Sequence, residues 1–143
     1  MPQQTTDQIP DRSTRERIKT VAIEAARQAG AILIEYAKNG FRVEHKDALN
    51  LVTDADTHSE QAIVDAIGRV FPDHEILAEA RGQAGKKSPY KWIIDPLDGT
   101  TNFAHGFPAY AVSIGVEYHG RCVLGVVLDP TRQELFVGEA GGG

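Results

Sequence analysis

The chain has 143 residues, of which 41% are hydrophobic and 24% charged, with a formal net charge of −5 and one cysteine. This length is enough for one domain with its own core, and the composition is that of an ordinary globular protein. The acidic balance argues against a general affinity for nucleic acid or anionic membrane, because both attract Lys and Arg. The single Cys122 excludes an internal disulfide, and its apolar neighbours predict a small buried thiol.

The chain is expected to form one domain, residues 13–143, behind a polar and flexible segment, residues 1–12. No secretory pattern and no apolar run long enough to span a membrane is visible. We therefore expect a cytoplasmic protein with no membrane partner.

Two amphipathic helices are predicted in the first half. Ser13 and Glu16 have the spacing of a capping box, which predicts the start of the first helix. Apolar residues then recur at helical spacing until Asn39-Gly40 ends the pattern. The second helix is expected to begin near Asp54–Thr57 and to end before Pro72.

Strands are predicted after these helices. Ile76-Leu77 and Trp92–Ile94 are short apolar runs typical of buried strands, with a polar loop, Arg81–Pro89, between them. Alternating apolar residues then predict three more strands, joined by turns at His119-Gly120 and Asp129-Pro130, as an antiparallel meander. The expected fold class is α+β, with two helices packed on one face of a largely antiparallel sheet.

The densest chemical signal is the run from Asp95 to Asn102, directly after the strand Trp92–Ile94. Pro96 stiffens the backbone, and Gly99 permits a conformation that a side chain would block. Such a turn can aim both carboxylates, Asp95 and Asp98, and the intervening Leu97 carbonyl at one point. Oxygen ligands suit a hard cation such as Mg²⁺, and Thr100 adds a hydroxyl beside it. The alternative is an ordinary surface turn, in which Asp, Pro and Gly are common.

A second group of polar residues lies at the start of the second helix. Thr53, Asp54 and Asp56 stand close together there, and the simplest interpretation is that one of them caps the helix. Glu79 comes after the strand Ile76-Leu77 and, taken alone, is an ordinary exposed acid.

Taken together, these stretches resemble the inositol monophosphatase family. The stretches that match its pattern in order and spacing are Asn50–Asp56, Phe71-Pro72, Ile76–Glu79, Trp92–Phe103, His105–Pro108, Val112–Gly115 and Gly125–Pro130. The resemblance covers roughly residue 15 to the end and implies the first helix and sheet layers of the fold shared by inositol monophosphatases and fructose bisphosphatases.

The resemblance also implies roles for particular residues. Glu79, Asp95 and the Leu97 carbonyl would hold one Mg²⁺, and Asp95 would bridge to a second bound by Asp98, with Mn²⁺ as a substitute. Thr100, paired with Asp56, would activate the attacking water.

Three further positions complete the implied site. The backbone N–H groups of Gly99 and Thr100 would bind substrate phosphate, and Lys46 would lie at the edge of the metal site. The implied reaction is Mg²⁺-dependent hydrolysis of a small phosphorylated polyol or sugar, chiefly myo-inositol monophosphate. A homodimer would fit the full-length family pattern.

The chain departs from the family in two ways. The usual Gly-Glu-Glu is Ala78-Glu79-Ala80 here, so the second acid is absent. Nothing matches the family's second half, so we expect a truncated chain of little activity. The alternative function is a metal-binding or protein-interaction module without turnover.

The meander places apolar residues on both faces. Tyr110, Val112, Ile114 and Val116 are expected on one face, and Val123 and Val127 with the small Ala111 and Gly115 on the other. Because two helices can cover only one face, the other is expected to be exposed and to favour self-association.

Overall fold

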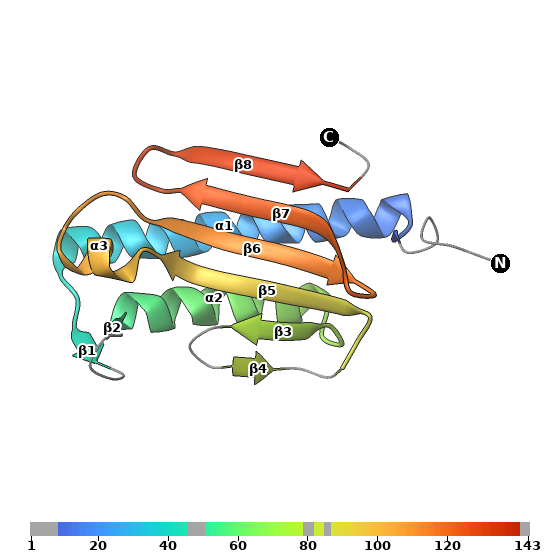
Figure 1. Ribbon diagram of the computed structural model, residues 1–143, viewed down its shortest axis with the longest axis horizontal. Helices are drawn as coiled ribbons and strands as arrows, with labels where there is room; N and C mark the ends of the chain where they lie inside the picture. The colour runs from blue at the N-terminus through green and yellow to red at the C-terminus, as the bar shows by residue number, and fades with distance from the viewer. Residues whose placement is uncertain (1–8, 46–50, 79–81, 85–86, 141–143) are drawn as a thin grey trace.

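The structure, a computed structural model, describes residues 9–45, 51–78, 82–84 and 87–140. Two long helices lie side by side against one face of a six-stranded sheet (Figure 1). The strand order is β4-β3-β5-β6-β7-β8, and β1 and β2 form a separate two-stranded sheet. Helices on one face of a largely antiparallel sheet are the α+β arrangement expected from the sequence.

The first helix, α1, spans Arg12–Asn39. Its N-cap is Asp11, whose carboxylate accepts from the backbone N–H of Thr14 at 3.4 Å and from the Thr14 hydroxyl at 2.6 Å. The predicted capping box of Ser13 and Glu16 is therefore wrong, because a strong acceptor two residues earlier already satisfies the first turn. The predicted end is confirmed, with Gly40 in a left-handed region at φ +100°.

The second helix, α2, spans Asp54–Val70, as predicted, and its N-cap is Thr53. The strands β1 (Val43–His45) and β2 (Leu51–Thr53) precede it and pair antiparallel. Three residues are too few for a period-two pattern, so the sequence contains no sign of this small sheet.

The six-stranded sheet contains one parallel pair. β3 (Glu75–Ala78) runs parallel to β5 (Tyr90–Asp98), and β4 (Gly82–Ala84) pairs antiparallel with β3. The prediction of a loop over Arg81–Pro89 is wrong for this part, because backbone pairing alone, without an apolar signal, makes β4 a strand. The antiparallel meander is confirmed as β6 (Ala111–Tyr118), β7 (Arg121–Asp129) and β8 (Glu134–Glu139).

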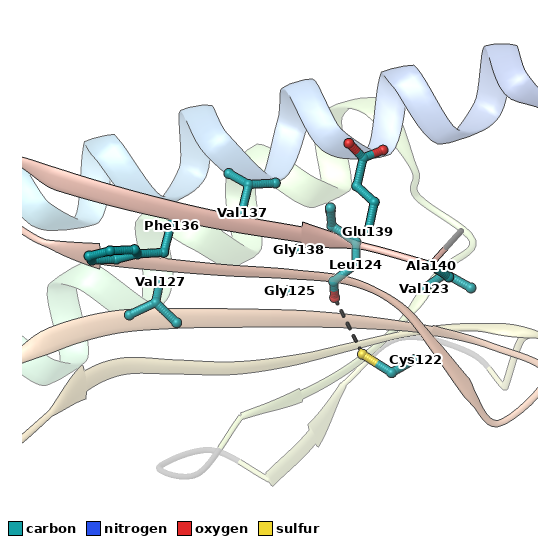
Figure 2. Close-up of a pocket in the computed structure, with 10 residues that line it drawn as sticks. All are labelled: Cys122, Val123, Leu124, Gly125, Val127, Phe136, Val137, Gly138, Glu139 and Ala140. Atoms are coloured by element: carbon teal, nitrogen blue, oxygen red, sulfur yellow. Dashed lines mark hydrogen bonds between the residues drawn. The ribbon is translucent and has the colours of Figure 1, made fainter. Parts of the chain in front are cut away.

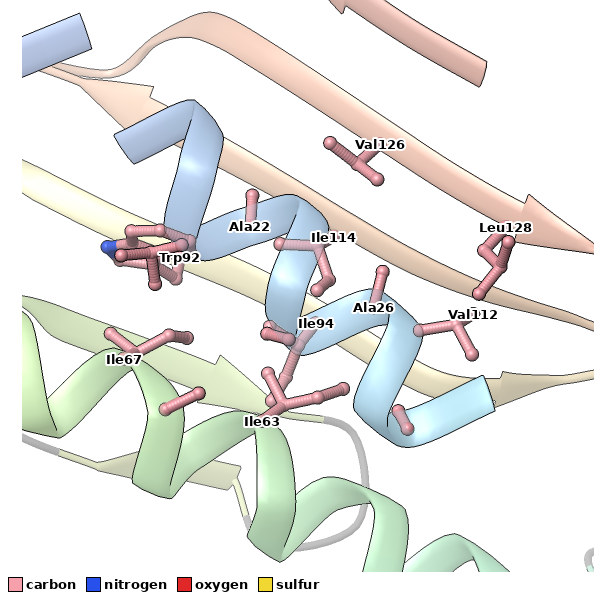
Figure 3. Close-up of a cluster of buried hydrophobic side chains, with 14 of the residues drawn as sticks. Ala22, Ala26, Ile63, Ile67, Trp92, Ile94, Val112, Ile114, Val126 and Leu128 are labelled. Carbon is pink, nitrogen blue, oxygen red and sulfur yellow. The ribbon is translucent and has the colours of Figure 1, made fainter. Parts of the chain in front are cut away.

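The core fills the space between the sheet and the two helices (Figure 3). Small residues such as Ala22 and Ala26 let α1 approach the sheet closely, while α2 contributes branched side chains, Ile63 and Ile67. Full burial of each large apolar side chain stabilises the fold by roughly 1.5–3 kcal/mol. The sheet side chains labelled in the figure are Trp92, Ile94, Val112, Ile114, Val126 and Leu128.

The opposite face of the sheet, which we call the outer face, carries exposed apolar side chains. Ile93 is 39%, Val127 40% and Phe136 58% exposed. Val127 lies on this face as predicted. Val123 does not, because a register shift between Val116 and Glu117 inserts a residue into β7 and Val123 is buried with the core.

A hollow of about 550 Å³ runs along β7 and β8 (Figure 2). Cys122 lies at one end of it, with its sulfur 3.6 Å from the Leu124 carbonyl oxygen. This cysteine is exposed, so the predicted buried thiol is wrong. In the part of the chain that the structure describes, no helix is long and apolar enough to cross a membrane.

Candidate functional site

The acidic run lies in a bulged strand rather than in a turn beyond a strand end. Asp95 pairs with Ser113 and Asp98 with Ala111, so β5 has one more residue than β6 over this interval. Such a bulge redirects the side chains that flank it. Leu97 is buried and its N–H donates to Asp95 Oδ1 at 3.3 Å, whereas Asp98 is exposed.

The chain then turns into a short helix, α3 (Thr100–Ala104), at Gly99. Gly99 has φ +102°, and a Cβ there would lie 2.8 Å from the Ala109 carbonyl oxygen and 3.2 Å from Tyr110 Cα. Glycine is therefore required both by conformation and by space. Tyr110 packs edge-on against Phe103 of α3 at 4.9 Å between ring centroids, and burial raises the pKa of the Tyr110 hydroxyl.

Thr100 connects the acidic run to the start of α2. Its hydroxyl lies 3.2 Å from Asp56 Oδ1 and 3.1 Å from the Leu97 carbonyl oxygen. A hydroxyl has one hydrogen, so it donates to one of these acceptors at a time. The contact joins residues 44 positions apart in sequence.

Asp56 is itself held by the start of α2. It forms a capping box with Thr53, and it is 8% exposed. The interpretation of these residues as a helix cap is therefore correct, yet Asp56 also keeps one carboxylate oxygen directed at Thr100. A capping role and a contact with the acidic run coexist in one side chain.

The structure thus brings together Asp56, Leu97 and Thr100, and links Asp95 to Leu97. Glu79 and Lys46 lie outside the described residues. Among the residues that the structure does describe, no group of three or more His, Cys, Asp or Glu side chains could hold a metal ion. The donors present, two carboxylates and a carbonyl, suit a hard cation, and they are fewer than the predicted set.

Sequence reasoning named Thr53 as a possible helix cap but did not link it to Asp56 in this network. Its hydroxyl donates to Asp56 Oδ2 at 2.7 Å, and its backbone N–H donates to the same oxygen at 2.8 Å. The signal was available, since Thr53 and Asp56 stand three positions apart at a helix start, as the residues of a capping box do.

Comparisons with known proteins show what this chain is similar to. The chain is 44% identical over 128 residues to a Pseudomonas aeruginosa protein named Nus factor SuhB, covering 86% of this chain and 47% of that protein. It is 47% identical over 118 residues to an inositol-1-monophosphatase of Synechocystis, covering 81% of this chain and 41% of that protein.

A solved structure of an IMPase/NADP phosphatase complexed with Mg²⁺ and phosphate superposes with a TM-score of 0.80 at 26% identity, covering 91% of this chain and 50% of that one. The chain thus spans about half the length of the relatives it matches. The profile described as the inositol monophosphatase family matches residues 14–143. This chain belongs to the inositol monophosphatase family.

Proposed function

We propose that this chain supplies the first half of a metal-dependent phosphomonoesterase site, with myo-inositol monophosphate as the expected substrate. The observation that carries the proposal is the hydrogen-bonding distance of 3.2 Å between Thr100 Oγ1 and Asp56 Oδ1, directly beside the acidic run. A hydroxyl linked to a buried carboxylate can accept a proton from water while passing its own to that carboxylate.

The reaction would proceed by direct attack of water on phosphorus. The water proton moves to Thr100 Oγ1, and the hydrogen of Thr100 moves to Asp56 Oδ1. The new P–O bond forms as the bond to the substrate alcohol breaks, and the alcohol oxygen takes a proton from solvent. The products are the free polyol and inorganic phosphate. Gly99 and Thr100, at the start of α3, would bind phosphate oxygens through their backbone N–H groups.

The chemistry of the donors fits a hard cation, because Asp95, Asp98 and the Leu97 carbonyl offer only oxygen ligands. These three would hold Mg²⁺, or Mn²⁺ in its place, together with Glu79. Bound Mg²⁺ would supply the positive charge that neutralises a phosphate dianion and lowers the pKa of coordinated water.

A second candidate is a binding module without turnover. The Pseudomonas relative bears the name of a factor rather than of an enzyme, and this chain spans 47% of its length. A metal-binding or protein-binding role would leave the acidic run intact and make Thr100 dispensable.

An assay of phosphate release from myo-inositol monophosphate in the presence of Mg²⁺ would distinguish the phosphomonoesterase from the binding module. The assay uses residues 1–143 alone and the same residues joined to the second half of the Synechocystis relative, which we call the hybrid. We expect turnover by the hybrid, a loss of most of it in Asp98→Asn, and no effect of the control Asp65→Asn on the exposed side of α2. A folded hybrid that binds Mg²⁺ but releases no phosphate would favour the binding module.

A further inference from the structure

Thr53 holds Asp56 by more bonds than a capping box needs. A capping box consists of two hydrogen bonds, here from Asp56 N to Thr53 Oγ1 at 3.2 Å and from Thr53 N to Asp56 Oδ2 at 2.8 Å. A third bond is added, because the Thr53 hydroxyl donates to Asp56 Oδ2 at 2.7 Å. Both residues are buried, with exposed fractions of 1% and 8%.

The third bond fixes the orientation of the carboxylate. Oδ2 receives two donors from Thr53, and Oδ1 remains for the Thr100 hydroxyl at 3.2 Å. Rotation of the carboxylate would break two bonds to an ionised acceptor, which are stronger than bonds between neutral groups. Asp56 Oδ1 is therefore kept facing Thr100.

This orientation matters because Thr100 has a competing acceptor. Its single hydrogen can go to Asp56 Oδ1 or to the Leu97 carbonyl oxygen, at nearly equal distances of 3.2 and 3.1 Å. Only the first choice lets the hydroxyl pass its hydrogen to a base as it accepts one from water. If the Asp56 carboxylate rotated away, the Thr100 hydroxyl would donate its hydrogen to the Leu97 carbonyl oxygen instead.

We propose that Thr53 is a positioning residue, whose hydroxyl directs Asp56 Oδ1 to Thr100 and so commits the Thr100 hydrogen to the proton transfer. This inference rests on the proposed phosphatase function. It assigns a task to a side chain that the family resemblance leaves without one.

Kinetics of the hybrid test the proposal with two variants and a matched control. Thr53→Ser keeps the hydroxyl, whereas Thr53→Val keeps the shape but loses both the cap acceptor and the donor. The control, Asp11→Ala, removes the cap of α1, whose partner is Thr14, and does not touch the site. All are assayed well below their unfolding transitions.

We expect Thr53→Val to lower kcat by about 10-fold or more with KM nearly unchanged, and Thr53→Ser to restore kcat to within about twofold. Asp11→Ala should lower the unfolding midpoint, as Thr53→Val does, and leave kcat unchanged. Equal kcat in Thr53→Val and the unsubstituted hybrid would overturn the proposal, as would a loss in Thr53→Ser as large as that in Thr53→Val.

A second measurement needs no turnover, so that failure of the phosphatase proposal is distinguishable from failure of this one. Unfolding midpoints of the hybrid are compared for Thr53→Val, Thr100→Val and the double variant. If Thr53 orients Asp56 toward Thr100, the midpoint shift of Thr100→Val shrinks when Thr53 is already replaced. Additive shifts would mean that Thr53 only caps α2.

Discussion

At the scale of single residues, His74 shows how burial sets chemistry in this chain. Its ring is stacked between Phe71 and Tyr90, with centroid distances of 4.3 and 4.4 Å, and Trp92 Nε1 donates to its Nδ1 at 2.9 Å. An indole N–H can only donate, so the bond requires an unprotonated Nδ1. Burial, chiefly, lowers the pKa of His74 from 6.5 to about 4, and the positive charge of Arg17 adds to this while Asp73 opposes it.

This shift predicts a loss of stability in mild acid. Between pH 6.5 and about 4 the unfolded chain binds a proton at His74 that the folded chain does not. The free energy of unfolding therefore falls as the pH falls through that window. Because the ring is only half-buried, we expect a contribution of about 1–2 kcal/mol, below the full linkage value.

Urea unfolding at several pH values would measure this loss in the chain and in His74→Gln. Glutamine can still accept from Trp92 but does not titrate, so the variant should lose less stability between pH 6.5 and about 4. Identical pH dependence in both proteins would show that His74 does not carry the effect.

At the scale of secondary-structure elements, the sequence predicts those helices and strands that have a regular apolar spacing and recognisable cap or turn residues. The helix α2 and the meander arise from regular apolar spacing and from turn residues such as His119-Gly120. The strand β4 has no such pattern, and it exists because β3 offers it a pairing edge. The N-cap of α1 is likewise not decided by residue type alone. Ser13 and Asp11 are both suitable N-cap residues, and the local backbone geometry decides between them.

The candidate site also contains some features that local sequence predicts and others that depend on the fold. Asp95, Asp98 and Thr100 stand close in sequence, so local reasoning finds them together. The family resemblance supplied the pairing of Thr100 with Asp56, since no local pattern links residues 44 apart. The bulge between Asp95 and Asp98 depends on the register with β6, which the sequence of β5 alone does not contain.

The junction between β5 and α3 should depend on Gly99 more than other turns depend on their glycines. Gly40 has a similar φ of +100°, although its ψ is 158° rather than 36°, and nothing lies within 4 Å of a built Cβ, so it serves as the uncrowded comparison. Gly40→Ala should cost about 1–2 kcal/mol, the strain of a left-handed backbone. Gly99→Ala adds a collision with the Ala109 carbonyl and should cost about 2–4 kcal/mol.

Chemical denaturation of both variants would give the two free energies. In addition, Gly99→Ala in the hybrid should weaken phosphate release, because α3 begins at the displaced backbone, while Gly40→Ala should leave it intact. Equal destabilisation by the two substitutions would show that crowding at Gly99 is relieved without cost.

At the scale of the whole molecule, the outer face is more apolar than the surface of a typical monomeric protein. Val127 and Phe136 are paired across β7 and β8 and are 40% and 58% exposed (Figure 2). Beside them Gly125 pairs with Gly138, and a Cβ built on either would meet no atom within 4 Å. Glycine weakens a strand interior, and it commonly marks a place where another backbone approaches closely.

We therefore expect the 143-residue chain alone to self-associate through this face and to have negligible phosphatase activity. The exposed apolar side chains of the outer face and the unpaired side of the edge strand β8 both favour association. Sedimentation velocity over a range of concentrations would measure it, with Phe136→Ser as the test variant and Phe107→Ser, at an equally exposed phenylalanine beyond α3, as the control. Phe136→Ser should shift the chain toward monomer, and Phe107→Ser should not, because only Phe136 stands in the apolar row of the outer face. A monomeric and fully active unsubstituted chain would contradict the prediction, as would equal effects of the two substitutions.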